Sequence, residues 1–269
     1  MSNEPKVSVV TIAFRDLPGL KKTVESVRSQ RYPHVEHVII DGGSGPEVVE
    51  YLTASDPAFA YWQSQPDDGR YDAMNQGIKH ATGQLVWFMH AGDCFSDPDA
   101  IGSVVDALAD KGPIESLWGY GNANRVDADG QVLNVWNSIP FDLHRFSTAR
   151  QVLPHQASFF GSELTRAVGG YDLSFDIAAD QLFMWRAALL HPPVTVDRIV
   201  CDFDTTGAGT TREMSKNYAD LRRAYDLLNH YPHGSRWKSF AFTRYHEYLT
   251  RSKMFVLGRL VRLKRMSTQ

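Results

Sequence analysis

The sequence has little of what marks a secreted or membrane-spanning protein. Its two cysteines, Cys94 and Cys201, are too few for a disulfide framework and form no C-x-x-C pair. No apolar run approaches the roughly 20 residues that cross a bilayer. The N-terminus lacks the apolar core of a signal peptide. We therefore expect reduced thiols and a cytoplasmic location.

Strong basic charge and the common phosphate-binding loops are also missing. The formal net charge is -3, so we do not expect general nucleic-acid binding. The glycine-rich segment Asp41–Gly45 is neither a G-x-G-x-x-G loop nor a Walker loop. The charge is uneven, however, because six basic and no acidic residues lie between Arg251 and Gln269, which leaves -9 for residues 1–250. This distribution indicates an anionic surface as a partner of the C-terminal end.

What is present is an ordinary core and a regular alternation of strands and helices. Hydrophobic residues make up 43% of the 269 residues, which suits one large domain or a domain with an extension. A β-branched run, a helical pattern and a second apolar run predict a βαβ unit, with parallel strands at 7–13 and 35–40 and a helix at 20–30 between them. Further strands are expected at 59–64, 84–89, 117–126, 131–136, 155–160 and 194–203. Further helices are expected at 47–53, 97–108, 162–168 and 180–190, in a segment that ends at Gly83, and across most of the chain after 212.

The stretch from Val86 to Asp93 has the pattern of a buried strand that ends in an acid. Its apolar and aromatic run continues to Met89 and is followed by a histidine, two small residues and Asp93. Open α/β sheets bind ligands at the carboxyl ends of their strands. We therefore expect Asp93 to hold a divalent metal on a nucleotide diphosphate. The alternative is an acid that merely caps the next helix.

Two other segments carry acids where a ligand site is expected. Asp41 follows the second strand, where it is either a base or ribose ligand or a solvated turn residue. The segment 65–77 is dense in polar groups, which predicts a functional loop that runs into a helix. Its acids Asp67, Asp68 and Asp72 are hydrogen-bond acceptors for a ligand or are solvated loop residues. Arg70 suits a diphosphate or pairs with a neighbouring acid.

Several of these motifs, in this order, resemble the family 2 glycosyltransferases of the GT-A fold. The resemblance covers roughly residues 5–210 and rests on the motifs VSVVTIAFRD, SVRSQRYP, VIIDGGSG, QPDDGRYDAMNQGIKHATGQ, VWFMHAGD, HQASFF and AADQLFMWRA. The Tyr-Asp-Ala-Met-Asn segment is similar to a bacterial subgroup that builds surface polysaccharides and glycolipids. The resemblance implies an α/β fold with a Rossmann-like, mostly parallel central sheet flanked by helices and a helical C-terminal extension.

The resemblance also implies a division of the chain and a donor site. Residues 1–215 would form the glycosyltransferase domain, with a nucleotide-sugar-binding half at 1–100 and an acceptor-binding half at 101–215. Residues 216–269 would form a basic helical extension. The donor would be a nucleotide diphosphate sugar, usually of uridine or guanosine. Its site would comprise Thr11, Ala13, Arg15, Asp41, Asp68, Arg70, Asp72, Asn75, Ala91 and Gly92.

The Asp-x-Asp metal motif of the family falls on Ala91-Gly92-Asp93, where only the last acid is present. A manganese or magnesium ion would then be held by Asp93, the two phosphates and water, since such ions keep water ligands. This thinner ligation leaves open a catalytically degenerate module that binds a nucleotide or a partner. A nucleotidyltransferase is a further alternative, although Phe14–Gly19 has only one arginine and one glycine for a triphosphate.

The family places its catalytic base at an acid that heads a helix in the second half, and Asp180 matches that position. A base opposite the leaving group implies displacement with inversion at the anomeric carbon. The alternative is an acid that caps its helix. His155 and Gln156 would face the acceptor, which is a glycan or a lipid-linked glycan. The amphipathic segment 251–265 would rest on the inner face of the cell membrane, or pack on the domain or on a dimer partner.

Overall fold

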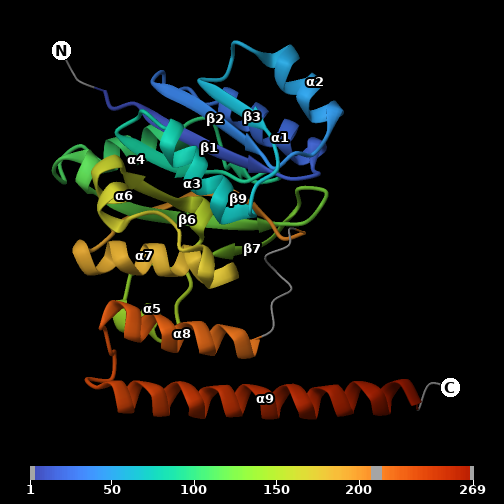
Figure 1. Ribbon diagram of the computed structural model, residues 1–269, viewed down its shortest axis with the longest axis vertical. Coiled ribbons are helices and arrows are strands. Elements are labelled where there is room, and N and C mark those ends of the chain that lie inside the picture. The colour runs from blue at the N-terminus through green and yellow to red at the C-terminus, as the bar shows by residue number, and fades with distance from the viewer. Residues whose placement is uncertain (1–3, 207–213, 267–269) are drawn as a thin grey trace. The chain divides into compact units, whose positions relative to one another are not determined.

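The computed structural model describes residues 4–206 and 214–266, with side chains left undescribed at 176–177, 214–216 and 253–266. The chain forms two compact units (Figure 1). The sheet unit comprises Met1–Phe141 and Val152–Thr210, and the helical unit comprises Asp142–Gln151 and Thr211–Gln269. The short segment 142–151 therefore belongs with the C-terminal helices, although the sequence assigns it to the acceptor half.

The sheet unit is built on one mixed sheet with the strand order β3-β2-β1-β4-β8-β6-β9-β5, and β7 pairs with β6. The first four strands in this order are parallel, as the predicted βαβ unit requires, and β6 and β9 are parallel as well. The remaining pairs are antiparallel. The strands are β1 (Val7–Ala13), β2 (Val35–Asp41), β3 (Tyr61–Ser64), β4 (Leu85–Phe88), β5 (Cys94–Phe95), β6 (Trp118–Val126), β7 (Val132–Trp136), β8 (Ser158–Gly161) and β9 (Val194–Asp204).

Helices cover both faces of this sheet, so its central strands are buried on both sides. Successive residues of β1 point to opposite faces. Val9 packs into a cluster that includes Ile101 and Val104 of α4, and Val10 lies against Gly77 of α3. A side chain at Gly77 would collide with Val10, which explains a glycine inside a helix. The helices of this unit are α1 (Leu17–Arg28), α2 (Pro46–Ser55), α3 (Arg70–His80), α4 (Ala100–Leu108), α6 (Ser162–Val168) and α7 (Ala179–Leu190).

The structure corrects three details of the expected elements. The segment predicted as a loop at 65–77 is helical from Arg70, and that helix ends at His80 rather than at Gly83. The end comes early because the Thr82 N–H and hydroxyl bind Glu36 of β2. The strand expected at 155–160 begins as a 3-10 turn at His155–Ala157 and becomes β8 only at Ser158. The two-residue strand β5 is too short to leave a sequence pattern.

The helical unit consists of α5 (Leu143–Ser147), α8 (Met214–Leu228) and α9 (Arg236–Met266). α8 and α9 run side by side in opposite directions (Figure 1). A buried ion pair at 2.9 Å joins Arg222 of α8 to Glu247 of α9. The Tyr225 hydroxyl donates to the Ser147 carbonyl of α5 at 3.1 Å. Within the described part of the chain, no helix has the length and apolar character to cross a membrane.

Candidate active site

The carboxyl ends of β1, β2 and β4 meet at one edge of the sheet, where the sequence places its candidate donor residues. Ala13, the last residue of β1, is paired with Asp41, the last residue of β2. The Gly42 N–H donates to the Ala13 carbonyl at 2.9 Å, and the Ala91 N–H donates to the Ile12 carbonyl at 3.0 Å. Three segments that are far apart in the sequence are thus joined at the switch region of an open α/β sheet.

Asp41 is fully buried and surrounded by donors. Its Oδ2 accepts from the Ser44 N–H at 2.9 Å and from the Ser64 hydroxyl at 2.6 Å. The Ser44 hydroxyl donates to its other oxygen. These donors hold the carboxylate in one orientation and stabilise its charge without any ligand.

The neighbouring candidates differ in what their side chains can reach. The Thr11 hydroxyl is buried and bonded to Nε2 of His37 at 2.8 Å, so it is already engaged. Arg15 has a φ of +54°, and its N–H donates to the Ser44 hydroxyl at 2.6 Å. Its guanidinium lies 4.8 Å from the centre of the Phe14 ring, and both residues are exposed. Arg15 therefore remains available to a ligand at this edge.

The acidic segment before α3 forms a network of its own. Asp67 accepts from the Gly69 N–H at 2.8 Å, and burial together with Asp72, Asp41 and Asp68 raises the pKa of its carboxyl group. Asp72 accepts from the Gln76 amide at 2.7 Å and from the Asp68 N–H at 3.2 Å. Like charges gathered in this way favour donors such as sugar hydroxyls.

Asn75 has a structural task in this arrangement. Its amide donates to the Tyr171 carbonyl at 2.9 Å, and its Oδ1 accepts from the Tyr171 N–H at 2.8 Å. Both polar ends of the side chain are thereby used on one backbone position nearly 100 residues away. Asn75 thus ties α3 to the loop between α6 and α7.

The turn that carries Asp93 is held by a threonine of α1. The buried Thr23 hydroxyl lies 2.8 Å from the Asp93 carbonyl and 3.1 Å from the His90 carbonyl, and it accepts from the Gly92 N–H at 3.0 Å. Gly92 has a φ of +98°, which other residues rarely adopt. A Cβ at Gly92 would also approach the carboxylate of Asp204 to 3.3 Å. The small residue in this motif therefore allows a second acid to come close.

Asp93 itself is buried and faces Asp204, the last residue of β9. Its Oδ1 accepts from the Asp204 N–H at 2.8 Å. Burial is the main cause that raises the pKa of Asp93 to about 8, and the negative charge of Asp204 adds to it. Hydrogen bonds from Asp204 and Gln156 and the charge of Lys22 act in the opposite direction. The ionised form of Asp93 therefore lacks sufficient positive charge nearby.

Sequence reasoning missed Asp204, although the signal was available. Asp41 and Asp93 each follow an expected strand, and Asp204 follows the strand expected at 194–203 in the same way. The pairing of β5 with β9 brings it to Asp93, with Cys94 opposite Asp202. That pairing could not be anticipated because β5 has only two residues.

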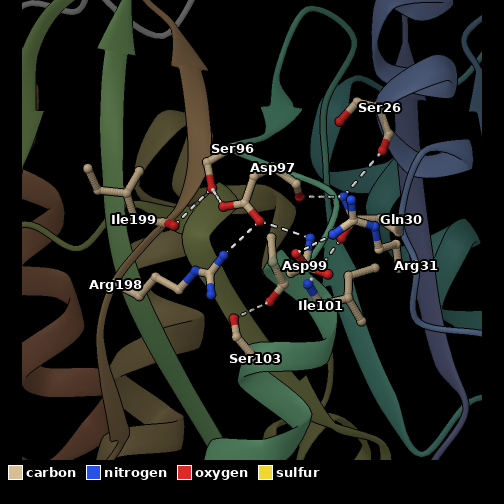
Figure 2. Close-up of polar contacts among 11 residues, drawn as sticks. Ser26, Gln30, Arg31, Ser96, Asp97, Asp99, Ile101, Ser103, Arg198 and Ile199 are labelled. Atoms are coloured by element: carbon tan, nitrogen blue, oxygen red, sulfur yellow. Dashed lines mark hydrogen bonds and ion pairs between the residues drawn. The ribbon is translucent and has the colours of Figure 1, made fainter.

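The segment after Asp93 forms polar contacts with β9 and with α1 (Figure 2). Arg198 of β9 pairs with Oδ1 of Asp97 at 2.7 Å, and the Ser96 hydroxyl donates to the Ile199 carbonyl at 2.8 Å. From α1, the Gln30 amide donates to the Asp97 carbonyl at 2.8 Å. These contacts fix the register of β5 against β9, which keeps Asp93 beside Asp204.

A chain of contacts leads from Asp93 toward the second half of the sheet unit. The side chain of Gln156 bonds with Asp93, and its amide nitrogen lies 3.2 Å from Nδ1 of His90. The rings of His90 and His155 are 5.9 Å apart, and Nε2 of His155 is bonded to the Tyr171 hydroxyl at 2.8 Å. Burial lowers the pKa of His155 to about 3, so this ring stays neutral. Gln156 therefore reaches the Asp93 end, while His155 is enclosed.

The chain of contacts ends at Asp180, in the first turn of α7. Tyr171 stacks on Tyr71 with ring centres 5.6 Å apart, and Tyr71 is hydrogen-bonded to the Asp180 side chain. Burial raises the pKa of Asp180 to about 6, against the opposing effects of the Gln181 N–H, Arg70 and Tyr71. Asp180 Oδ1 accepts from that N–H at 2.7 Å, so it also serves its own helix terminus.

Tyr71 is a second residue that sequence reasoning missed. It lies within the polar segment 65–77, for which the sequence predicts a loop that runs into a helix, whereas the helix already begins at Arg70. In the helix, the ring of Tyr71 is buried and placed between Tyr171 and Asp180. The helical spacing of Tyr71 and Met74 offered a weak signal.

The Asp93 end fits a divalent metal with few protein ligands. Among the described residues, no group of three or more histidine, cysteine, aspartate or glutamate side chains is placed to hold an ion. Asp93 and Asp204 provide two carboxylates, and a buried acid of raised pKa beside a second acid gains stability from a cation. Magnesium and manganese accept such a pair when phosphate oxygens and water complete the coordination.

Comparison with known proteins shows the family of this chain. The model of the family described as Glycosyl transferase family 2 matches residues 8–162. An uncharacterized glycosyltransferase of Mycobacterium tuberculosis, Rv1514c, is 54% identical over 256 residues, which cover 95% of this chain and 96% of that protein. A PGL/p-HBAD biosynthesis glycosyltransferase of Mycobacterium bovis is 27% identical over 65% of this chain and 67% of its own length.

Solved structures show the same fold at low sequence identity. TarS 1-349 of S. aureus, in complex with UDP-GlcNAc, superimposes with a TM-score of 0.66 and 14% identity, over 84% of this chain and 67% of that one. The mannosyltransferase PcManGT of Pyrobaculum calidifontis, in complex with GDP-Man and Mn²⁺, has a TM-score of 0.57 and 17% identity, over 97% and 81%. The expected GT-A architecture with a helical C-terminal region is thereby confirmed. With the family model matching more than half of the chain, this protein is a glycosyltransferase that belongs to glycosyl transferase family 2.

Proposed function

We propose that this enzyme transfers a sugar, with inversion, from a nucleotide diphosphate sugar to a hydroxyl group of a glycan or lipid-linked acceptor. The observation that carries the proposal is the pair of acids, the buried Asp93 and the partly buried Asp180, whose pKa values are both raised and which one chain of contacts connects. Two acids with different surroundings suit two different tasks in one reaction.

Asp180 is the proposed general base. The acceptor hydroxyl attacks the anomeric carbon, the bond from that carbon to the diphosphate oxygen breaks, and the hydroxyl proton passes to the Asp180 carboxylate. A pKa of about 6 leaves this carboxylate ionised near neutral pH and still basic enough to accept a proton. Tyr71 and the helix N–H hold the carboxylate in place, so the base is oriented before the acceptor arrives.

Asp93 and Asp204 are the proposed protein ligands of a manganese or magnesium ion at the other end of the site. Bound there, the ion would neutralise the charge that develops on the departing diphosphate. Gln156 orients the Asp93 carboxylate, and Thr23 holds the backbone of its turn. Both contacts form without a ligand, so the carboxylates need little rearrangement when the donor binds.

The donor would lie across the sheet edge between Asp41 and Asp93. Asp41 offers an oriented carboxylate to a base or ribose, and Arg15, Arg70, Ala91 and Gly92 are proposed contacts to the nucleotide or its phosphates. Asp68 and Asp72 would accept hydrogen bonds from the sugar. Thr11, Ala13 and Asn75 would act through backbone or positioning, because the side chains of Thr11 and Asn75 are already bonded within the protein.

A nucleotide-binding module without catalysis is the competing proposal, and the alanine at position 91 favours it. The two can be separated with the purified protein, manganese and a panel of nucleotide sugars. A donor that stabilises the protein by mass action would identify the nucleotide and the sugar. Hydrolysis or transfer of that donor, lost in Asp180→Asn while the thermal shift persists, supports the enzyme. A thermal shift without turnover on any acceptor or water would overturn the proposed transfer and leave the binding module.

A further inference from the structure

Charge is divided sharply between the two units. The helical unit contains fifteen basic and five acidic residues, a formal charge of +10. Because the whole chain carries -3, the sheet unit carries -13. A difference of this size within one chain indicates that the helical unit meets an anionic surface, which an acidic sheet unit on its own would avoid.

The first half of α9 presents aromatic and basic side chains to solvent on one face. Trp237, Arg244, Tyr248 and Arg251 follow each other at intervals of seven, four and three residues, which places them along one side of a helix. Trp237 is 76% exposed and Tyr248 is 70% exposed. The side chains of Arg244 and Arg251 are 69% and 66% exposed. The described residues thus leave most of both aromatic rings uncovered.

The arginines keep an excess of positive charge on this face. Arg244 and Arg251 lie 3.5 Å and 3.0 Å from the carboxylate of Glu247, which also pairs with Arg222 of α8 at 2.9 Å. Three guanidinium groups thus share one carboxylate, and that carboxylate is buried. These four side chains carry a net charge of +2 beside the exposed rings.

The kinds of exposed residue distinguish the partner. Trp and Tyr combine an apolar ring with a polar tip, which suits the boundary between lipid headgroups and acyl chains. A stable protein interface has an apolar, densely packed centre. In the described part of α9, however, the large exposed hydrophobic side chains are Trp237, Tyr245 and Tyr248, and none is aliphatic. A long helix with this pattern and a basic flank fits a flat anionic surface.

We infer that the face of α9 formed by Trp237, Arg244, Tyr248 and Arg251 binds the surface of an anionic lipid bilayer. The rings would enter the interfacial layer, and the two arginines would contact lipid phosphates. The inference goes beyond sugar transfer and does not depend on it, because lipid binding needs neither donor nor acceptor. It extends the basic segment 251–265 toward the N-terminus of α9; the side chains of that segment beyond Ser252 lie outside the described residues.

The test is flotation of the full chain with vesicles of phosphatidylcholine, with and without phosphatidylglycerol, at low and high salt. We expect binding to the anionic vesicles that weakens with salt. R244Q/R251Q should lower the partition coefficient roughly 30-fold, the equivalent of about 1 kcal/mol for each charge. W237A/Y248A should lower the partition coefficient for the same vesicles and leave its dependence on salt unchanged. The matched control is K111Q/R166Q, which removes two exposed charges from the sheet unit and should not change binding.

Circular dichroism of each variant establishes that it is folded, and Glu247 keeps its Arg222 partner in R244Q/R251Q. Three outcomes would overturn the inference. The wild type could fail to float with anionic vesicles at low salt. R244Q/R251Q could bind as well as the wild type. Sedimentation could show a wild-type dimer that R244Q/R251Q dissociates while vesicles do not bind, which would assign the face to a second copy of the chain.

Discussion

The two ends of the candidate site contain the same kind of residue in opposite surroundings. Burial raises the pKa of Asp93 to about 8 and of Asp180 to about 6. Beside Asp180 lie the Arg70 guanidinium and the Tyr71 hydroxyl, which stabilise its ionised form. Beside Asp93 lies the carboxylate of Asp204, whose negative charge destabilises the ionised form, while the Asp204 N–H, Lys22 and Gln156 stabilise it. Burial alone therefore does not assign a role; the neighbours do.

This difference explains why one acid suits a proton and the other suits a metal. A carboxylate that titrates just below neutral pH can take a proton from a hydroxyl during turnover. A carboxylate held beside another acid gains most from a divalent cation that neutralises both. Experiments that remove one acid, or one group beside an acid, test the comparison directly.

Removal of the proposed base should have the largest effect. Asp180→Asn keeps the shape of the side chain but cannot accept the acceptor proton, so we expect kcat to fall about 10²- to 10⁴-fold. Donor affinity, measured by thermal shift or calorimetry, should stay near the wild-type value. Asp172→Asn is the control, since this acid lies before the 3-10 helix Leu173–Ala178 that precedes α7, where it bonds to Ser174 and pairs with Arg186 at 3.7 Å. Equal losses in donor binding and kcat would contradict the assignment.

Removal of Asp93 or Asp204, the acids at the proposed metal end, should weaken the metal-dependent binding of the nucleotide rather than the proton transfer. Asp93→Asn and Asp204→Asn should each lower the affinity for a nucleoside diphosphate in the presence of manganese about 10- to 100-fold. Affinity measured with a chelator should change little. Asp202→Asn is a suitable control, because Asp202 lies two residues before Asp204 on the same strand and is bonded to Asn124. If the loss is the same with chelator, these acids do not act through a metal.

The pH dependence of stability should separate the two ends without any substrate. A raised pKa means that the folded state holds the Asp93 proton more tightly than the unfolded chain does. Its contribution to stability is thus present below about pH 4 and is lost as the pH rises toward about 8. Asp93→Asn resembles the protonated acid, so it should raise the free energy of unfolding of the metal-free protein at pH 8 by a few kcal/mol. Each kcal/mol should raise the Tm by about 2 to 4 °C.

An acid with the opposite shift provides the control for this measurement. The Arg198 guanidinium lowers the pKa of Asp97, so its stabilising effect is present at neutral pH and is lost as the pH falls below about 4. Asp97→Asn should therefore destabilise the protein slightly at pH 7, by about 0.2 to 1 kcal/mol for a partly exposed pair. If Asp93→Asn also destabilises at pH 8, the charge of Asp93 is compensated within the protein.

The sequence predicts the positions of the candidate acids better than it predicts their neighbours. Asp41, Asp93 and Asp180 are visible because each stands at the end of a strand or the start of a helix, and such boundaries follow from local patterns. The parallel order of the first four strands follows from the βαβ rule in the same way. These features depend on residues that are close together in the chain.

The neighbours depend on contacts between distant segments. Asp204 reaches Asp93 only because β5 pairs with β9, more than 100 residues away. Gln156 was expected on the acceptor side, yet its side chain bonds with Asp93, because a 3-10 turn rather than a strand presents it. No local pattern specifies which way such a turn points its side chains. The chemistry of each acid was therefore less predictable than its position.

Removal of one hydroxyl group near the base should produce the smallest and most specific effect. The hydrogen bond from Tyr71 lowers the pKa of Asp180. Without it, in Tyr71→Phe, that pKa should rise, and the acidic limb of the kcat profile should move from about pH 6 to higher pH. At pH 8, where the base is ionised in both proteins, kcat should differ less than about tenfold.

Tyr171→Phe provides the matched control for this change. It removes a hydroxyl group from a ring of the same aromatic stack, but the Tyr171 hydroxyl bonds to His155 rather than to Asp180. The acidic limb should therefore stay in place in this variant. A uniform loss of kcat in Tyr71→Phe at every pH, with no movement of the limb, would show that Tyr71 only fills space. A shifted limb in Tyr71→Phe alone would mean that a side chain of α3 tunes a base on α7, which makes the two halves of the sheet unit one catalytic site.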